Sequence, residues 1–197
     1  DHSGHSVAEI YRIVEGSALT PDIKSQSIEV FERLAAAEAR VHSTSVDRVH
    51  LHEAGAMDAI ADVVGSIAAL SSLGVHRVFS SRLRFGTGFA KCSHGRLPVP
   101  VPAVVELCKD LPCEQTDIAA ELVTPTGAAL ITTLAEGFGS APPFTQECVG
   151  YGSGKRDLDA IPNLLRVRIG EQSSDLHGDH CMIVEANIDD MNPEIFG

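Results

Sequence analysis

The sequence has 197 residues, is 44% hydrophobic and contains no Trp, so it can bury one substantial core built mainly from aliphatic side chains. Its formal net charge of −12 argues against a nucleic-acid partner, because phosphate binding needs clustered Lys and Arg. The 5 cysteines form no Cys-x-x-Cys pair, and no apolar run reaches the ~20 residues of a membrane span, so we expect a soluble cytoplasmic protein with reduced thiols.

Capping signals near the start of the chain predict two helices. A capping-box pattern at residues 6–9 should begin the first helix, which should end at Gly16. The pair Thr20-Pro21 should begin a second helix that runs to about His42. Its buried face is expected to consist of Ile23, Ser27, Val30, Phe31, Leu34 and Val41.

A third helix is predicted over residues 57–73 and should be closed by Gly74. One face carries an apolar stripe of Ile60, Val63, Val64, Ile67 and Leu70. The opposite face consists of small or acidic residues, namely Asp58, Ala61, Asp62, Gly65, Ser66 and Ala69. Small side chains allow another element to come close, so we expect this helix to be buried on both faces.

The second half of the chain alternates strands with short helices and turns. We expect strands at 75–79, 145–149, 163–169 and 182–188, helices at 103–109 and from Thr124 to about 137–139, and an extended, non-central segment at 96–102. The fold class is therefore α+β, with helices packed on a mixed sheet. A polar stretch at 171–179 predicts a linker between a first domain, residues 1–170, and the start of a second α+β domain at 180–197.

The densest group of metal-binding side chains lies just before and within the start of the third helix. His50 and His52 share one face if their segment is extended, and Glu53 follows them. Asp58 and Asp62 are one helical turn apart, so they share a face as well. Imidazoles and carboxylates suit Ni²⁺, Zn²⁺, Mn²⁺ or Co²⁺. A surface histidine pair beside helix-capping aspartates explains the same pattern without a metal, and both interpretations stay open.

Two segments could bind an anion. Thr124, Thr126 and Gly127 begin a helix, where free amides favour negative charge, although simple capping needs no ligand. Lys155 and Arg156 end a glycine-rich stretch that fits neither the Walker pattern nor the dinucleotide fingerprint. A β-turn with a solvated basic tip is the alternative interpretation of that stretch.

Five segments together resemble the LarC-type nickel insertion proteins: VHLHEAGAMDAIADVVG, HGRLPVPVPA, ELVTPTGAALITTL, GYGSGKRDLDAIPNLLR and EANIDDMNPE. The resemblance implies a nickel chelatase, a lyase that inserts Ni²⁺ into pyridinium-3,5-bisthiocarboxylic acid mononucleotide to complete the nickel-pincer cofactor of lactate racemase. It implies the use of CTP with a divalent cation by a domain beyond residue 197. We therefore expect the chain to be a central fragment that lacks the family's first segment, with His2 and His5 as the remnant of a His-rich run.

Under this hypothesis His50, His52 and Glu53 would hold Ni²⁺, with Asp58 and Asp62 as further ligands or as groups that orient the ligands. The expected partners are the mononucleotide substrate, a cofactor-receiving racemase and further copies of the chain. Two alternatives remain. A metal-dependent hydrolase could use the same residues, although Ala54 and Gly55 interrupt its usual pattern. A nickel carrier without catalysis would bind the metal only.

Overall fold

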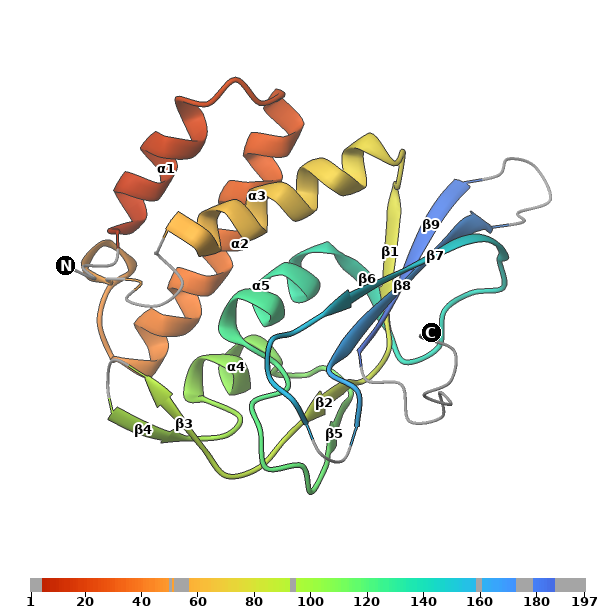
Figure 1. The fold of residues 1–197 in the computed structure, drawn as a ribbon. Coiled ribbons are helices and arrows are strands. Elements are labelled where there is room, and N and C mark those ends of the chain that lie inside the picture. Colours follow the sequence, from red (N-terminus) through yellow and green to blue (C-terminus); the bar gives the residue numbers. More distant parts are fainter. Residues whose placement is uncertain are drawn as a thin grey trace.

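Helices dominate the first half of the chain and strands the second (Figure 1). This computed structural model describes residues 5–49, 51, 57–92, 95–158, 161–172 and 179–186. The helices are α1 (Val7–Glu15), α2 (Pro21–Val41), the 3-10 turn η1 (Val46–Arg48), α3 (Met57–Ser72), α4 (Pro102–Leu107) and α5 (Pro125–Leu134). The strands are β1 (Arg77–Ser80), β2 (Leu83–Phe85), β3 (Phe89–Cys92), β4 (Gly95–Pro98), β5 (Cys113–Gln115), β6 (Ala135–Phe138), β7 (Thr145–Ser153), β8 (Leu164–Gln172) and β9 (Asp179–Ala186). The mixture of helices with parallel and antiparallel strands confirms the predicted α+β class.

The long helix α2 is the centre of the helical layer, because α1, α3, α4 and α5 all pack against it. Its side chains Val30, Phe31 and Leu34 are 0% exposed. Ser27 is buried among them, and its hydroxyl donates to the carbonyl of Ile23 at 2.7 Å, which satisfies the polar group inside the core. The predicted buried face is therefore confirmed except at its last member, Val41, which is 38% exposed at the end of the helix.

The predicted starts of α1 and α2 are confirmed. At α1 the Ser6 hydroxyl accepts from the amide of Glu9 at 3.3 Å, and the Glu9 carboxylate accepts from the amide of Ser6 at 2.8 Å. At α2, Thr20 is the N-cap and Pro21 the first helical residue. Because these ends are fixed by local hydrogen bonds and by proline geometry, the sequence alone locates them well.

α3 ends at Ser72, one residue before the predicted end, and Gly74 lies just beyond it in the left-handed conformation with φ +66°. The prediction that α3 is buried on both faces is wrong. Its small-residue face, made of Asp58, Ala61, Asp62, Gly65, Ser66 and Ala69, is exposed. No described atom lies within 4 Å of the position that a Cβ of Gly65 would take. Small side chains permit close packing, but the apolar stripe alone is enough to anchor the helix to α2.

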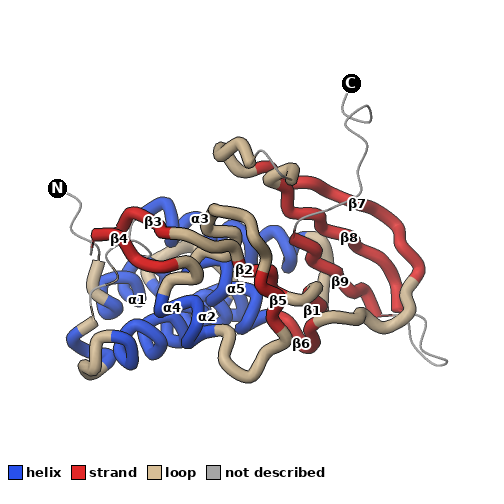
Figure 2. Tube along the Cα trace, turned by 90° about the horizontal axis from the view of Figure 1, so that it is seen from below, coloured by secondary structure: helices blue, strands red, loops and turns tan. Residues whose placement is uncertain are grey.

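The main sheet has five strands in the order β6-β1-β9-β8-β7. β1 runs parallel to β6 and β9, whereas β8 pairs antiparallel with both β9 and β7. One face packs on the helices, because Val78 and Ile169 contact Leu70 of α3 and Ile131 of α5. Figure 2 shows the helices gathered on one side of the molecule and this sheet on the other.

Two predictions about this sheet are wrong. Residues 135–138 form β6 instead of continuing the preceding helix, because Gly137 is a poor helix former and lets the strand pass close to the ring of Phe79. The first residues of the glycine-rich stretch, 150–153, continue β7 instead of forming a loop. Their pairing with residues 164–167 of β8 outweighs the turn preference of Gly150 and Gly152.

Two small sheets lie apart from the main one: β2 pairs parallel with β5, and β3 pairs antiparallel with β4. Only residues 96–98 of the predicted extended segment lie in this two-stranded hairpin, away from the centre of a sheet. The chain bends at residues 99–100, and Pro102 is already the first residue of α4, so the prediction is wrong for the end of the segment. α4 begins one residue earlier and ends two residues earlier than the predicted helix 103–109.

Residues 179–186 form β9, which pairs with both β1 and β8 in the main sheet. The division into a domain of residues 1–170, a linker at 171–179 and a second domain at 180–197 stays a prediction. Among the described residues, no helix has the length and apolar character that a membrane crossing would require.

Candidate functional site

The start of α3 presents two carboxylates on one exposed face. Asp58 and Asp62 are both exposed, and the side chain of Asp58 accepts from the amide of Ala59 at 2.9 Å. Neither carboxylate forms an ion pair with another described residue. Both are therefore available to a cation from solvent.

The other predicted metal ligands, His50, His52 and Glu53, lie outside the described residues. Within the described part of the chain, no group of three or more His, Cys, Asp or Glu side chains is arranged to hold a metal ion. The predicted convergence of all five residues on one ion therefore stays a prediction.

At the start of α5, the structure shows a completed helix cap. The hydroxyl of Thr124 accepts from the amide of Gly127 at 3.2 Å, and the carbonyl of Thr124 accepts from Ala128 at 2.8 Å. Thr124 and Gly127 are exposed and Thr126 is half-buried, so solvent reaches this helix start. The capping interpretation is confirmed, and an anion at Thr124, Thr126 and Gly127 stays a prediction.

The basic pair Lys155-Arg156 lies in the turn between β7 and β8. Asn163 closes this turn: its side chain donates to the carbonyl of Arg156, and its carbonyl accepts from Gly154, both at 3.0 Å. Both basic side chains are exposed, and neither forms an ion pair with a described acidic residue. Two unneutralised positive charges in an acidic chain leave this turn able to attract an anion.

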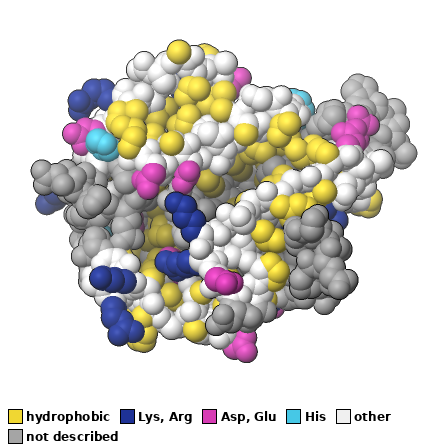
Figure 3. Space-filling view, in the orientation of Figure 1, with side chains coloured by type: hydrophobic (Ala, Val, Ile, Leu, Met, Phe, Trp, Pro, Cys, Tyr) yellow, Lys and Arg dark blue, Asp and Glu magenta, His cyan; other side chains and the backbone are white. Residues whose placement is uncertain are grey.

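The view of Figure 3 shows a hollow between the helical layer and the β7–β8 hairpin. Hydrophobic side chains gather along its length, and acidic and basic side chains lie close together in the middle of this face, below α3. Leu165 of β8 is 43% exposed and lies on the same face of the sheet as Ile169, so it points toward the helical layer. Val149 and Tyr151 pair with Arg168 and Arg166 and share the opposite face. A face of this kind can receive a ligand that combines charged groups with a flat apolar part.

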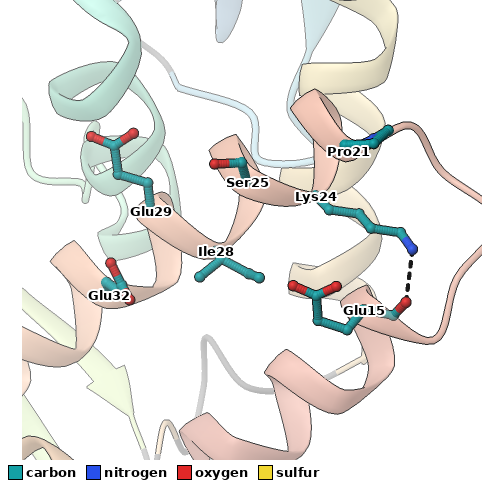
Figure 4. A pocket seen from close by; sticks show the side chains of 7 residues that line it. All are labelled: Glu15, Pro21, Lys24, Ser25, Ile28, Glu29 and Glu32. Atoms are coloured by element: carbon teal, nitrogen blue, oxygen red, sulfur yellow. Dashed lines mark hydrogen bonds between the residues drawn. The ribbon is translucent and has the colours of Figure 1, made fainter.

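A second depression lies over α1 and α2 and was not predicted from the sequence. Figure 4 shows Ile28 between Glu15 on one side and Glu29 and Glu32 on the other. The ammonium group of Lys24 donates to the carbonyl of Glu15 at 2.7 Å and ties the end of α1 to α2. The three glutamates are spread over two helices, so no sequence period brings them together.

Burial raises the pKa of Tyr11 and Cys108 in the helical layer and of Cys113 at the start of β5. Burial, with a smaller contribution from the negative charge of Glu32, raises the pKa of Tyr11 to about 12. Burial, with the nearby Cys113, raises the pKa of Cys108 to about 12, and burial also raises the pKa of Cys113. Cys108 therefore stays protonated at neutral pH, which makes it a poor metal ligand, and it is a buried core residue, whereas Cys113 is exposed in β5.

Comparison with known proteins gives the family. The profile described as nickel insertion protein matches residues 1–197. A relative from Geobacter metallireducens, named for nickel insertion, is 47% identical over 198 residues, which cover 100% of this chain and 51% of the relative. A pyridinium-3,5-bisthiocarboxylic acid mononucleotide nickel insertion protein from Desulfitobacterium hafniense is 44% identical over 201 residues, covering 99% of this chain and 50% of the relative.

The chain thus spans about half the length of the curated relatives it matches. No solved structure matches it. The match to the family profile extends over all 197 residues, and the chain therefore belongs to the nickel insertion protein family.

Proposed function

We propose that this chain takes part in the insertion of Ni²⁺ into pyridinium-3,5-bisthiocarboxylic acid mononucleotide, with both the metal and the mononucleotide as substrates. The observation that carries the proposal is the family match over residues 1–197, together with relatives named for this reaction. The exposed carboxylates of α3 support it, because they are open to a cation and are not engaged by any described positive charge.

Asp58 and Asp62 would act with His50, His52 and Glu53 to hold Ni²⁺ before transfer. Imidazole and carboxylate ligands bind nickel firmly enough to capture it, whereas the sulfur atoms of the acceptor are softer donors that favour its release to the substrate. The chain's net charge of −12 would favour the approach of the cation.

The mononucleotide carries a phosphate and two thiocarboxylates, so its site needs positive charge and free amides. We propose two binding sites for these anionic groups. One is the turn that contains Lys155 and Arg156, and the other is the helix start at Thr124, Thr126 and Gly127. When nickel bonds a carbon of the pyridinium ring, that carbon releases a proton. A carboxylate or a neutral imidazole beside the metal would accept it.

Further parts of the proposal rest on the resemblance to LarC-type proteins. They are the lyase class, dependence on CTP with a divalent cation, delivery of the product to a lactate racemase, and a cytoplasmic location. CTP binding is assigned to the part of the family's chain that lies beyond residue 197.

The metal site is tested by nickel titration calorimetry on the full-length protein. His50→Ala/His52→Ala should weaken Ni²⁺ binding at least about 10-fold, in line with losses seen when metal-site residues are removed. The matched control is His42→Ala/His76→Ala, which removes two exposed histidines elsewhere and should leave the affinity unchanged. Equal affinity in both double variants would place the nickel site elsewhere.

The reaction is tested by mass spectrometry of the mononucleotide after incubation with Ni²⁺ and the protein. The expected product has gained one nickel and lost the protons that the metal displaces. A protein that binds nickel stoichiometrically yet leaves the acceptor unchanged would be a carrier, and the insertion proposal would be wrong.

A further inference from the structure

The outer face of the β3–β4 hairpin is unusual for an exposed surface. Because side chains alternate along paired strands, Ala90 and Leu97 point inward and pack against the main core. Phe89, Lys91, Arg96 and Pro98 then share the outward face. Phe89 is 64% exposed, the highest value among the large hydrophobic side chains described.

The charges on this face are not neutralised by the rest of the described chain. Lys91 and Arg96 lie opposite each other across the two strands, and neither forms an ion pair with a described residue. The guanidinium of Arg96 stacks over the Phe89 ring, 5.1 Å from its centroid, and most of the Phe89 side chain remains exposed. Figure 3 shows Lys and Arg side chains gathered over this hairpin.

An exposed aromatic ring flanked by Arg resembles the centre of a protein interface, where aromatic residues and Arg are enriched. A small-molecule site is usually concave, whereas this face is the outer surface of a two-stranded hairpin. The charges require an acidic partner. A second copy of this chain is such a partner, because each copy has 27 acidic and only 15 basic residues and is present wherever the hairpin is.

We propose that the Phe89–Lys91–Arg96 face docks on a second copy of this chain, at the depression lined by Glu15, Glu29 and Glu32. Ile28 and Pro21 lie in that depression and offer apolar contact to the Phe89 ring (Figure 4). Lys24 also lines it, but three glutamates outnumber this one cation, and its ammonium group is held by the carbonyl of Glu15. The hairpin and the start of α2 lie at opposite ends of the helical layer, so one molecule cannot close the contact on itself (Figure 1).

The contact is head-to-tail, since two different surfaces meet, and it can continue from copy to copy until a ring closes. One hairpin face is small compared with a standard interface of roughly 1,600 Å², so the association is weak and depends on protein concentration. Salt weakens it, because exposed charges are screened.

Sedimentation velocity of the full chain over a range of concentrations tests the proposal. The wild type should associate with rising concentration at low salt. Lys91→Glu/Arg96→Glu and Glu29→Lys/Glu32→Lys should each raise the dissociation constant at least about 10-fold. Mixing these two variants should restore association, because the intact hairpin of one fits the intact depression of the other and the two charge-reversed surfaces also match in charge.

The control matched to Lys91→Glu/Arg96→Glu is Arg48→Glu/Lys109→Glu, which makes the same change in net charge at exposed positions off the hairpin and should associate like the wild type. Phe89→Ala tests the apolar part, and circular dichroism checks that each variant is folded. A wild type that stays monomeric at all concentrations overturns the proposal. A second result would also overturn it. If the protein is monomeric and binds nicotinate mononucleotide in calorimetry, and Phe89→Ala loses this binding, the hairpin face binds an anionic ring compound instead of a second copy.

Discussion

The helical layer around α2 and the β7–β8 hairpin differ in where their stability comes from. In α2, Phe31 and its neighbours are fully buried, and four other helices pack around them. In β7 all nine residues are exposed, and the strand is held mainly by its pairing with β8. Side-chain packing therefore fixes the first region, and backbone hydrogen bonds fix the second.

This difference separates positions that maintain the fold from positions that are free to serve function. The candidate metal and anion residues Asp58, Lys155 and Arg156 are all exposed, and they lie on or beside the surface that packing does not constrain. Substitutions in the two regions should therefore affect stability very differently.

The largest expected effect is the loss of a core side chain in α2. Phe31→Ala should lower the free energy of unfolding by about 3–5 kcal/mol, because it removes apolar contacts and leaves a cavity. Val149→Ala in β7, where the side chain is 45% exposed, should cost less than about 1 kcal/mol. Urea denaturation followed by circular dichroism measures both, and similar losses would contradict the division between the two regions.

Replacing glycines of the β7–β8 hairpin by alanine should change the stability less. The sign of the change depends on how close the neighbouring backbone lies to the added Cβ atom. A Cβ on Gly170 would lie 2.0 Å from the carbonyl oxygen of Thr145, so Gly170→Ala should cost about 1–3 kcal/mol. Gly150 has no described atom within 4 Å of its Cβ position, so Gly150→Ala should stabilise the strand by up to about 1 kcal/mol. Thermal unfolding of both variants sharpens the comparison, and a destabilised Gly150→Ala would show that β7 is covered in solution.

The sequence predicted the helical layer well because burial imposes a period on it. The buried stripe of α2 was readable up to Leu34, and local caps located the starts of α1 and α2. In segments that do not pack against the core, the sequence pattern gave wrong predictions. The small face of α3 suggested a second contact that the described structure lacks, and Gly150 suggested a turn although strand pairing continues to Ser153.

For the candidate site, composition and spacing identified residue types and left their arrangement open. Asp58 and Asp62 share an exposed face as helical spacing requires. The acidic depression over α1 and α2 could not be predicted, because Glu15 and Glu32 come together only through the packing of two helices. The outward position of Phe89 depends on the register of β3 with β4, which the sequence does not specify.

The smallest expected effect concerns acid sensitivity at the surface of the helical layer. Hydrogen bonds from the backbone and side chain of Ser6 lower the pKa of Glu9 below its ordinary value of 4.5. A carboxylate with a lowered folded-state pKa stabilises the fold fully above its unfolded-state pKa, and this contribution disappears as the pH falls through the folded-state value. The wild type should therefore lose slightly more stability than Glu9→Gln between about pH 5 and pH 3. Ser6→Ala keeps the backbone donor, so it should remove only part of this difference. Urea denaturation at a series of pH values gives the slopes, and parallel curves for wild type and Glu9→Gln would mean that the capping box contributes nothing to acid stability.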